Sequence, residues 1–275
     1  MLGSGSRGNA ILVATDRTRI LVDAGLSGKE MADRLDQVGV PPGSVDGVVV
    51  THEHGDHTRG CGIFARRFGT PLFMTSATRD ACASLLRGSE VVHLYRPGNV
   101  FLVGDLRVEP FLTAHDAVDP VAVTLTAEKC GTRVGIATDL GRPTAGARHA
   151  LTGCDFLILE ANHDEALLRA GPYPPSVQAR IASSHGHLSN RAAAALAREL
   201  LHPGLVGIVL AHLSAECNLP ELARRTVYKA LREAGWDGVL EVASQDAPTA
   251  LIDIPQLQRD RVRRREIETG QLSLL

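Results

Sequence analysis

Residues 52–57 concentrate side chains that ligate metals: the segment is His52-Glu53-His54-Gly55-Asp56-His57. Imidazole nitrogen and carboxylate oxygen are ligands that suit zinc, manganese or iron, and the absence of cysteine from this segment argues against a thiolate site. In an extended segment His-x-His directs both rings to one side, and Asp56-His57 can turn toward a second metal. A single histidine is more often a core or surface residue than a ligand, but this density of donors predicts a metal site.

The element that positions this segment is a short apolar strand, Val48–Thr51, which directly precedes it. The same order, a strand followed by a residue with ligand chemistry, recurs at three other places. These are Leu106–Phe111 before His115, Arg133–Ala137 before Asp139, and Val206–Leu210 before His212. Ligands that arrive from four strand ends imply one shared rim. This arrangement fits two mixed sheets sandwiched between helices, a four-layer αββα fold of the α/β class.

The sequence also predicts the helices around the sheets. Ser27, with Glu30 in capping-box spacing, is expected to begin a helix that Gly39 ends. Further helices are predicted over Thr58–Phe68, from Ser76 as the cap to about Leu86, over Asp164–Ala170, over Arg191–Leu201 with Asn190 as the cap, and over Leu219–Ala234. Strands at Val239–Val242 and Thr249–Ile254 are expected to finish the sheet.

The composition indicates one globular domain, residues 1–254, followed by a charged tail, residues 255–275. The chain has 275 residues, of which 44% are hydrophobic and 22% charged, as is ordinary for a globular protein. Its net charge of −2 provides no overall attraction to nucleic acid, so such binding must depend on a local patch or on metals. No membrane span or secretory signal is visible, and the five scattered cysteines indicate free thiols in the cytoplasm.

The segment Thr51–His57 resembles the signature of the metallo-β-lactamase fold superfamily, and other segments resemble its YycJ/WalJ-like exonuclease branch. These segments are Gly5–Asn9, Leu21–Ser27, His115–Pro120, Thr138–Gly141, Glu160–Asp164, Gly171–Pro174, Gly186–Asn190 and Ala211–Ser214. The resemblance extends over residues 3–254, almost the whole chain. Arg7 departs from it, since a small residue is expected there, and this departure leaves the role of the N-terminal loop open.

The resemblance implies a site for two divalent metal ions, with manganese as plausible as zinc for such donors. The first ion would be held by His52, His54 and His115, the second by Asp56, His57 and His212, and both by the bridging Asp139. A hydroxide shared by the metals would attack phosphorus, with Asp56 orienting it. Asp23 would stand behind the ligands and brace the metal loop.

Two further histidines, His163 and His187, have two interpretations. They are either structural imidazoles bonded to the backbone or catalytic groups that bind a phosphate or protonate the leaving oxygen. Phosphate binding is also predicted for four polar residues: Ser6, Asn9, Asn162 and Ser189. Three histidines without companion donors are predicted to lie on the surface: His93, His149 and His202.

The tail combines the charged run Arg259–Glu266 with the final peptide Gln271-Leu272-Ser273-Leu274-Leu275. It is either a solvated tail or a partner-binding segment, because the last five residues resemble the short peptide by which bacterial replication and repair proteins bind the sliding clamp. In the second case Leu272, Leu274 and Leu275 would enter an apolar groove while Gln271 is held by hydrogen bonds. The charged run would then be a flexible linker whose arginines contact phosphates.

These observations predict a metal-dependent phosphodiesterase, and the resemblance implies a 5′-to-3′ DNA exonuclease that acts in DNA repair or replication. The first alternative is an RNA-processing nuclease such as tRNase Z or RNase J, although residues 140–211 are too few to hold the inserted domain of RNase J. The second is a small-molecule hydrolase that cleaves thioesters or lactams. A non-enzymatic binding module fits poorly with an intact ligand set. The oligomeric state stays open.

Overall fold

The computed structural model describes residues 1–272, with the backbone alone at residues 265 and 268–272. Within this range the strands form two mixed sheets. The first has the order β1-β2-β3-β4-β5 and contains β1 (Ile11–Ala14), β2 (Arg19–Val22), β3 (Gly47–Val49), β4 (Leu72–Thr75) and β5 (Val92–Tyr95). Only the β1–β2 pair in it is antiparallel.

The second sheet has the order β12-β11-β10-β9-β8-β7-β6. Its strands are β6 (Phe101–Val103), β7 (Leu106–Leu112), β8 (Val121–Ala127), β9 (Arg133–Ala137), β10 (Phe156–Glu160), β11 (Gly207–Ala211) and β12 (Val239–Val242). Strands β6 to β9 pair in antiparallel fashion and β9 to β12 in parallel. Because β9, β10 and β11 run in parallel, the segments that follow these strands lie at the same edge of the sheet.

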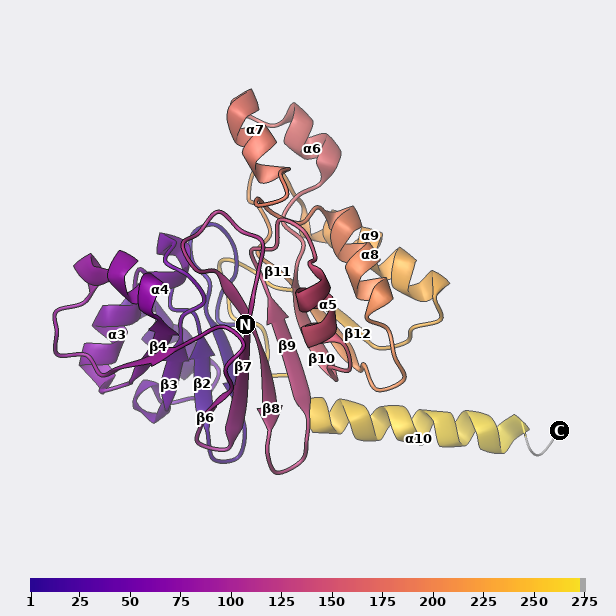
Figure 1. The fold of residues 1–275 in the computed structure, drawn as a ribbon. Coiled ribbons are helices and arrows are strands. Elements are labelled where there is room, and N and C mark those ends of the chain that lie inside the picture. The colour runs from indigo at the N-terminus through magenta and orange to yellow at the C-terminus, as the bar shows by residue number, and fades with distance from the viewer. Residues whose placement is uncertain (273–275) are drawn as a thin grey trace.

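Three apolar clusters correspond to the three interfaces between four layers (Figure 1). The middle cluster joins the inner faces of the two sheets, for example Val49 with Val123 and Ile158. The outer face of the first sheet is covered by α1 (Gly28–Gln37) and α3 (Cys61–Phe68). The outer face of the second sheet is covered by α5 (Ala145–Leu151), α8 (Asn190–Glu199) and α9 (Pro220–Glu233). The predicted αββα arrangement is confirmed.

The first helix begins and ends as its sequence predicts. The Ser27 side chain accepts a hydrogen bond from the Glu30 amide at 3.1 Å, which satisfies a donor that the helix leaves free. Gly39 follows the helix with a φ of 75°, a left-handed conformation that glycine adopts at little cost. The segment predicted as one helix over Thr58–Phe68 is divided, because Gly60 separates α2 (Gly55–Thr58) from α3.

Two predicted helix caps are each one residue too late. The cap of α4 (Ser76–Ala81) is Thr75, whose side chain accepts from the Thr78 amide. The cap of α8 is Ser189, whose side chain accepts from the Ala192 amide. In both pairs two adjacent polar residues could serve, and the earlier one has the extended backbone that capping requires. Helix α4 also ends at Ala81 and gives way to a 3₁₀ turn, Ala83–Leu85.

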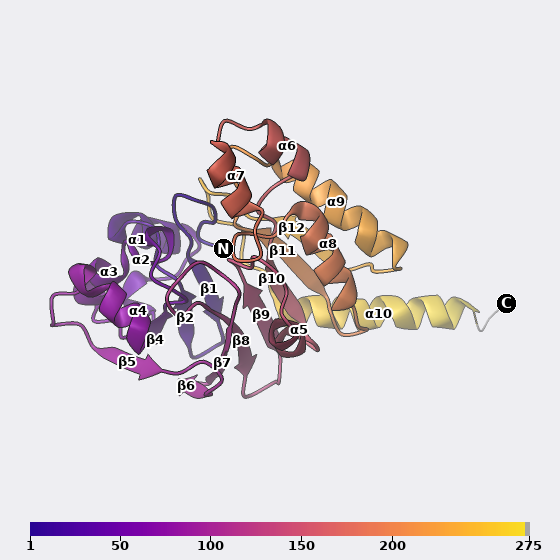
Figure 2. The same cartoon turned by 45° about the horizontal axis from the view of Figure 1, so that its top comes forward.

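The C-terminal segment differs most from the prediction. Residues 249–253 form no strand, and helix α10 (Ile254–Leu272) takes the place of a flexible linker. Asp253 accepts a hydrogen bond from the Gln256 amide at 2.8 Å and Pro255 occupies the first turn, which are helix-start signals. Ile254 and Leu257 pack against the core between the sheets. Farther along, α10 extends away from the body (Figures 1 and 2).

Two short helices leave the body at the opposite end (Figures 1 and 2). They are α6 (Glu165–Ala170), which lies within the predicted helix over Asp164–Ala170, and α7 (Pro175–Ile181), which was not predicted. Pro175 stands in the first turn of α7, where its lack of an N–H costs nothing. Among the described residues, no helix is both long and apolar enough to cross a membrane.

Candidate metal centre

The sequence-predicted donors come from the strand ends of both sheets. Asp23 directly follows β2, residues 52–57 follow β3 by a short connection, and His115 follows β7. Asp139 and His212 follow β9 and β11. Because these strands end at one edge of the sandwich, residues far apart in sequence meet there.

Three of these residues turn the chain in the left-handed region: φ is 65° at Asp23, 56° at Asp139 and 56° at His212. In the described part of the chain they are the non-glycine residues with positive φ. This conformation costs a side-chain-bearing residue about 1–3 kcal/mol and persists only where its surroundings impose it. The sharp turn directs each side chain into the site immediately after its strand.

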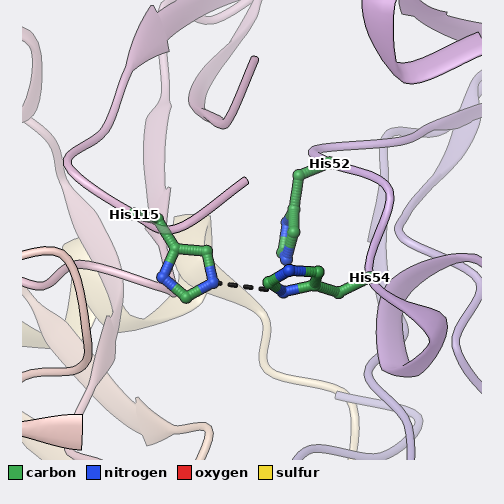
Figure 3. A group of neighbouring side chains, drawn as sticks. All are labelled: His52, His54 and His115. Carbon is green, nitrogen blue, oxygen red and sulfur yellow. Dashed lines mark hydrogen bonds between the residues drawn. The ribbon is translucent and has the colours of Figure 1, made fainter. Parts of the chain in front are cut away.

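The first cluster consists of His52, His54 and His115, whose ligand atoms lie within 4.8 Å of one another (Figure 3). Nε2 of His115 is 3.3 Å from Nδ1 of His54. The opposite ring nitrogens have other partners: Nδ1 of His115 is 3.1 Å from the Gly186 carbonyl and Nδ1 of His52 is 2.9 Å from the Thr51 hydroxyl. These contacts leave the remaining nitrogens directed at one point.

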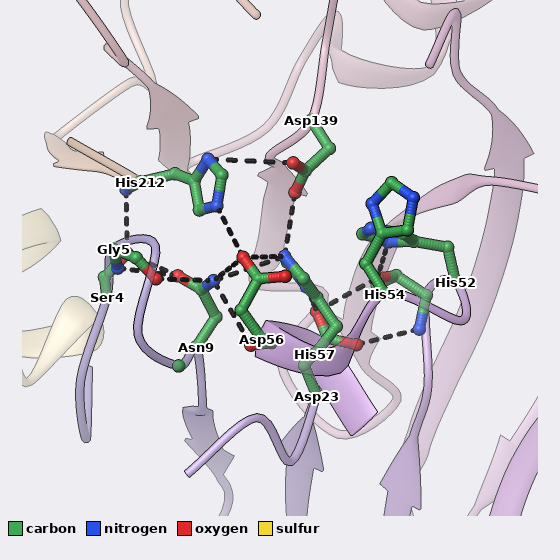
Figure 4. Close-up of polar contacts among 12 residues, drawn as sticks. Ser4, Gly5, Asn9, Asp23, His52, His54, Asp56, His57, Asp139 and His212 are labelled. Carbon is green, nitrogen blue, oxygen red and sulfur yellow. Dashed lines mark hydrogen bonds and ion pairs between the residues drawn. The ribbon is translucent and has the colours of Figure 1, made fainter. Parts of the chain in front are cut away.

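The second cluster consists of Asp56, His57 and His212 (Figure 4). Nε2 of His212 is 3.2 Å from Asp56 Oδ2, and Nε2 of His57 is 3.5 Å from the same oxygen. Asp139 stands between the two clusters: its Oδ2 is 3.1 Å from His57 Nε2 and its Oδ1 is 3.6 Å from His115 Nε2. The fold thus brings together all seven residues predicted as ligands.

One buried nitrogen at the centre tests whether a cation fits. His52 Nε2 is buried and makes no hydrogen bond within the described residues, while the buried Asp139 Oδ2 faces Nε2 of His57. Leaving a buried nitrogen without a partner is costly in a protein interior, and His52 Nε2 faces the other donors. A set of imidazoles and carboxylates around such a nitrogen fits divalent metal binding.

The clusters differ in charge when no cation is bound. Burial, reinforced by His57, lowers the pKa of His52 well below its ordinary value, and burial lowers the pKa of His115. Burial also opposes protonation of His57 and His212, but Asp139 and other carboxylates outweigh it, so the pKa of His57 rises well above its ordinary value and that of His212 rises to about 10. A cation would therefore displace protons from the second cluster.

Asp23 lies behind the first-sheet donors. Its Oδ2 is 2.7 Å from Nδ1 of His57, and its two oxygens accept from the amide and hydroxyl of Thr51 at 2.8 and 3.0 Å. The Thr51 hydroxyl in turn contacts His52. One buried carboxylate therefore fixes the orientation of His57 directly and of His52 through Thr51.

Glu160, to which sequence reasoning gave no role, has the corresponding place in the second sheet. It is fully buried at the end of β10. Its Oε1 is 2.7 Å from Nδ1 of His187 and 3.1 Å from Nδ1 of His212, and its Oε2 accepts from the amides of Leu140 and Leu188. Burial would raise its pKa, but His187 and His212 outweigh burial and lower it to about 2.

The sequence held a signal for Glu160. A charged residue that ends an otherwise apolar strand, between strands that deliver Asp139 and His212, repeats the order of strand and donor. The strand expected over Phe156–Leu159 leads directly into Glu160, which β10 includes as its last residue. The sequence still gives Glu160 no role, because spacing along the chain does not show that it lies beside His187 and His212.

The two histidines left open lie in different surroundings. His187 is at the site: burial would lower its pKa, but the charge and hydrogen bond of Glu160 outweigh burial and raise it. His163 is 3% exposed, and its Nδ1 has no hydrogen-bond partner among the described residues. Its backbone pairs with Ser189, and burial lowers its pKa.

Three of the four residues predicted to bind phosphate use their polar atoms within the protein. Asn9 bonds to Ser4 and Gly5, and its Nδ2 lies 3.2 Å from His57 Nε2 (Figure 4). Asn162 donates to the carbonyl of His212 at 2.9 Å. Ser189 caps α8 and donates to Glu165. These contacts brace the site, whereas Ser6 is exposed beside Asn9's loop.

The histidines predicted at the surface are placed differently from one another. His93 and His149 are exposed, but His202 is partly buried and its Nε2 lies 2.9 Å from the Cys154 carbonyl. His202 therefore holds the turn before β11 instead of standing in solvent. Of the peptide predicted to bind a clamp, Gln271 and Leu272 form the last turn of α10, and residues 273–275 lie outside the described residues.

Comparison with known proteins agrees with this geometry. Residues 3–144 match the model of the metallo-beta-lactamase superfamily. The chain is 35% identical over 238 residues to a Bacillus anthracis protein named exodeoxyribonuclease YycJ, covering 86% of this chain and 89% of the relative. It is 34% identical over 262 residues to exodeoxyribonuclease WalJ of Streptococcus pneumoniae, covering 92% and 97%.

The metallo-β-lactamase fold protein YhfI from Bacillus subtilis has a similar structure, with a TM-score of 0.69 over 90% of this chain and 95% of that chain at 19% identity. The chain therefore belongs to the metallo-β-lactamase superfamily. It is a metal-dependent hydrolase whose relatives include the YycJ and WalJ proteins over most of its length.

Proposed function

We propose that this hydrolase is a dinuclear-metal-dependent phosphodiesterase, a 5′-to-3′ DNA exonuclease that acts in DNA repair or replication. The observation that carries the proposal is the pair of three-donor clusters with Asp139 between them. Two metals held close together suit in-line displacement at phosphorus, because they can stabilise both the attacking and the leaving oxygen. The names of the YycJ and WalJ relatives support DNA as the substrate.

In this proposal His52, His54 and His115 hold one divalent ion, Asp56, His57 and His212 hold the other, and Asp139 contacts both. Zinc and manganese both suit these nitrogen and oxygen donors. When bound, the ions supply a water of lowered pKa and neutralise the phosphate. We place the enzyme in the cytoplasm, where the five cysteines described as free thiols stay reduced.

The chain's own residues then divide the proton transfers. Asp56 is the partly exposed carboxylate of the second cluster, with 22% of its side chain accessible, and orients the attacking water. His187 donates a proton to the leaving oxygen in this proposal, which its partial exposure and its hydrogen bond to Glu160 support. Glu160 supports this role because it holds the His187 ring and raises its pKa. His163 stays a candidate for contact with a phosphate.

The test is a nuclease assay on 5′- and 3′-labelled DNA and RNA with zinc, manganese and magnesium in turn. We expect mononucleotides to be released from the 5′ end of DNA, with zinc or manganese supporting the reaction. Release from RNA alone would favour an RNA-processing nuclease. Cleavage of a thioester or lactam, with every nucleic acid left intact, would overturn the phosphodiesterase assignment.

We propose separately that Gln271–Leu275 binds the sliding clamp. Helix α10 changes how this peptide is presented, because it holds the preceding residues in a helix and carries them away from the body (Figure 1). The distance from the catalytic edge would let a clamp bind without covering the site.

A further inference from the structure

The α6–α7 arm, residues 165–181, stands at the catalytic end of the molecule. It follows β10, the strand that ends in Glu160, and projects beyond the body in both views (Figures 1 and 2). The chain returns from α7 through residues 182–186 to His187. The arm is thus inserted between two residues that bond to each other in the site, Glu160 and His187.

The base of the arm is packed tightly against the loops that carry Asp139 and His115. A Cβ added at Gly141 would lie 2.4 Å from the Ser184 carbonyl oxygen, and one at Gly186 would lie 2.2 Å from the Ile181 carbonyl oxygen. The Gly186 carbonyl is also the partner of His115 Nδ1. These close approaches fix the end of α7 beside the first cluster.

Two exposed arginines lie on these touching segments. Arg180 is at the end of α7, and Arg142 directly follows Gly141. Arg180 Nη1 is 3.3 Å from Asp116 Oδ2, and Oδ1 of the same carboxylate is 3.4 Å from Nε2 of His115. Arg142 makes no ion pair with any residue in the described part of the chain. A contiguous path therefore runs from the first cluster through Asp116 to Arg180 at the rim.

We propose that Arg142 and Arg180 bind backbone phosphates of the nucleic-acid strand next to the diester that is cleaved. Asp116 forms an ion pair with Arg180 until a phosphate replaces it. This inference rests on the proposed nuclease function and names the surface that holds its substrate. The planar guanidinium suits a phosphate, with which it can form two parallel hydrogen bonds. A strand would pass between the arm and the site.

The charge distribution favours this interpretation over a general attraction. The whole chain has a net charge of −2, so attraction to a polyanion must be local. At the arm, Arg169 and Arg180 are exposed, while the acidic Glu165 at its start is only partly exposed. The Arg180 side chain is 67% exposed against 33% for Asp116, which keeps the guanidinium accessible to a ligand while it is paired.

The test compares Arg180→Ala and Arg142→Ala with Arg225→Ala in the full-length, metal-loaded enzyme. Arg225 is exposed on α9 and is the matched control. We expect each rim variant to raise KM for a single-stranded oligonucleotide about tenfold with a small change in kcat, since a hydrogen bond to a charged group is removed. The logarithm of the association constant decreases linearly with the logarithm of the salt concentration. The magnitude of this slope should fall by about 0.7 for each phosphate of a single strand that the variant no longer neutralises. Arg225→Ala should match the wild type in both KM and salt slope.

Asp116→Asn should change KM in the opposite direction from the arginine variants. A variant that only damaged the site would not tighten substrate binding. Removing the competing charge should lower KM by up to about fivefold, the value of an exposed ion pair. Binding of a fluorescent oligonucleotide to the metal-free chain, measured by anisotropy, should weaken for Arg180→Ala and Arg142→Ala and tighten for Asp116→Asn. The length of the oligonucleotide is a further variable. The ratio of KM between Arg180→Ala and wild type should be larger for a ten-nucleotide strand than for a dinucleotide.

The inference is overturned if the rim variants keep the KM and salt slope of the wild type, or if Arg225→Ala weakens binding as much as they do. The second result would mean that the attraction is general and not a property of the rim. Failure of the proposed function would look different, because the wild-type enzyme would then hydrolyse neither oligonucleotides nor bis(p-nitrophenyl) phosphate with any metal.

Discussion

Each sheet supplies one buried carboxylate that stands behind the metal-facing imidazoles, and the two carboxylates differ in reach. Asp23, from the first sheet, contacts one histidine and one threonine within the same metal-loop segment. Glu160, from the second sheet, contacts two histidines and two backbone amides from three separate loops. The first arrangement orders a single loop, whereas the second holds several loops against one another. We therefore expect the second half of the site to be the more sensitive to loss of its carboxylate.

Removal of the residue shared by both halves should have the largest effect. Asp139→Asn should reduce DNA cleavage more than about a hundredfold, because loss of a central donor should exceed the 10–100-fold typical of a residue that orients a ligand. Asn tolerates the left-handed backbone found at this position, so circular dichroism should show an intact fold. Metal content should fall in mass spectrometry. A variant with near-normal nuclease rates would remove the proposed two-metal mechanism.

Glu160→Gln should have the next largest effect, a loss of roughly a hundredfold in kcat. The amide can still accept one hydrogen bond, but it no longer provides the charge that raises the pKa of His187. If His187 donates a proton in the reaction, the alkaline limb of the pH–rate profile should move to lower pH. A variant with reduced kcat but an unchanged profile would limit Glu160 to holding the loops.

Asp23→Asn should cost less, about tenfold in activity, because the amide can still bond to Thr51 and only His57 loses its charged partner. Its position also tolerates Asn, since φ is 65° there. Assayed beside Glu160→Gln, this variant measures the contrast between the sheets directly. Equal losses in the two variants would mean that the number of imidazoles held by each carboxylate does not matter.

The acid stability of the metal-free chain offers a smaller, equilibrium measure of the same contrast. The folded-state pKa of Glu160 is about 2, against 4.5 for an unperturbed glutamate. Because this pKa is depressed, its contribution to folding is fully present above pH 4.5 and is lost as the pH falls toward 2. Urea titrations across this interval should show a smaller loss of stability for Glu160→Gln than for the wild type. Parallel curves would contradict the assignment.

Deletion of residues 271–275 should have the smallest effect on chemistry, because this peptide belongs to neither half of the site. Cleavage of short DNA should equal that of the full-length enzyme, while co-elution with a bacterial sliding clamp should be lost. Absence of co-elution for the full-length chain would reject the clamp proposal.

The two halves of the site are also unequally visible in the sequence. Residues 52–57 indicate a metal loop by themselves, since all their donors are local. His115, Asp139 and His212 are found because each follows an apolar strand, and the resemblance to a known superfamily gives them roles. Glu160 is missed because its partners come from loops distant in sequence. Its contacts depend on sheet order, which spacing along the chain does not encode.

Most of the fold follows from local patterns, and the errors have local causes. The caps at Thr75 and Ser189 are displaced from their predicted positions because two polar neighbours compete at each helix start. The final predicted strand is wrong because Ile252 packs against the core between the sheets directly before a helix whose start signals are Asp253 and Pro255. Helix α7 is missed because its prolines suggest only a loop. Both of these helices lie outside the sheets, where apolar periodicity is weak.

The left-handed turns at Asp23, Asp139 and His212 have an evolutionary consequence. Asp, Asn and His are the side chains that enter this backbone region most readily after glycine, and Asp and His are also donors for metals. One small set of residue types thus satisfies both the turn and the chemistry. Drift to Asn or Gly at Asp139 and His212 would silence the enzyme without unfolding it, so inactive descendants of this fold should keep the scaffold and carry Asn or Gly where these two metal donors once stood.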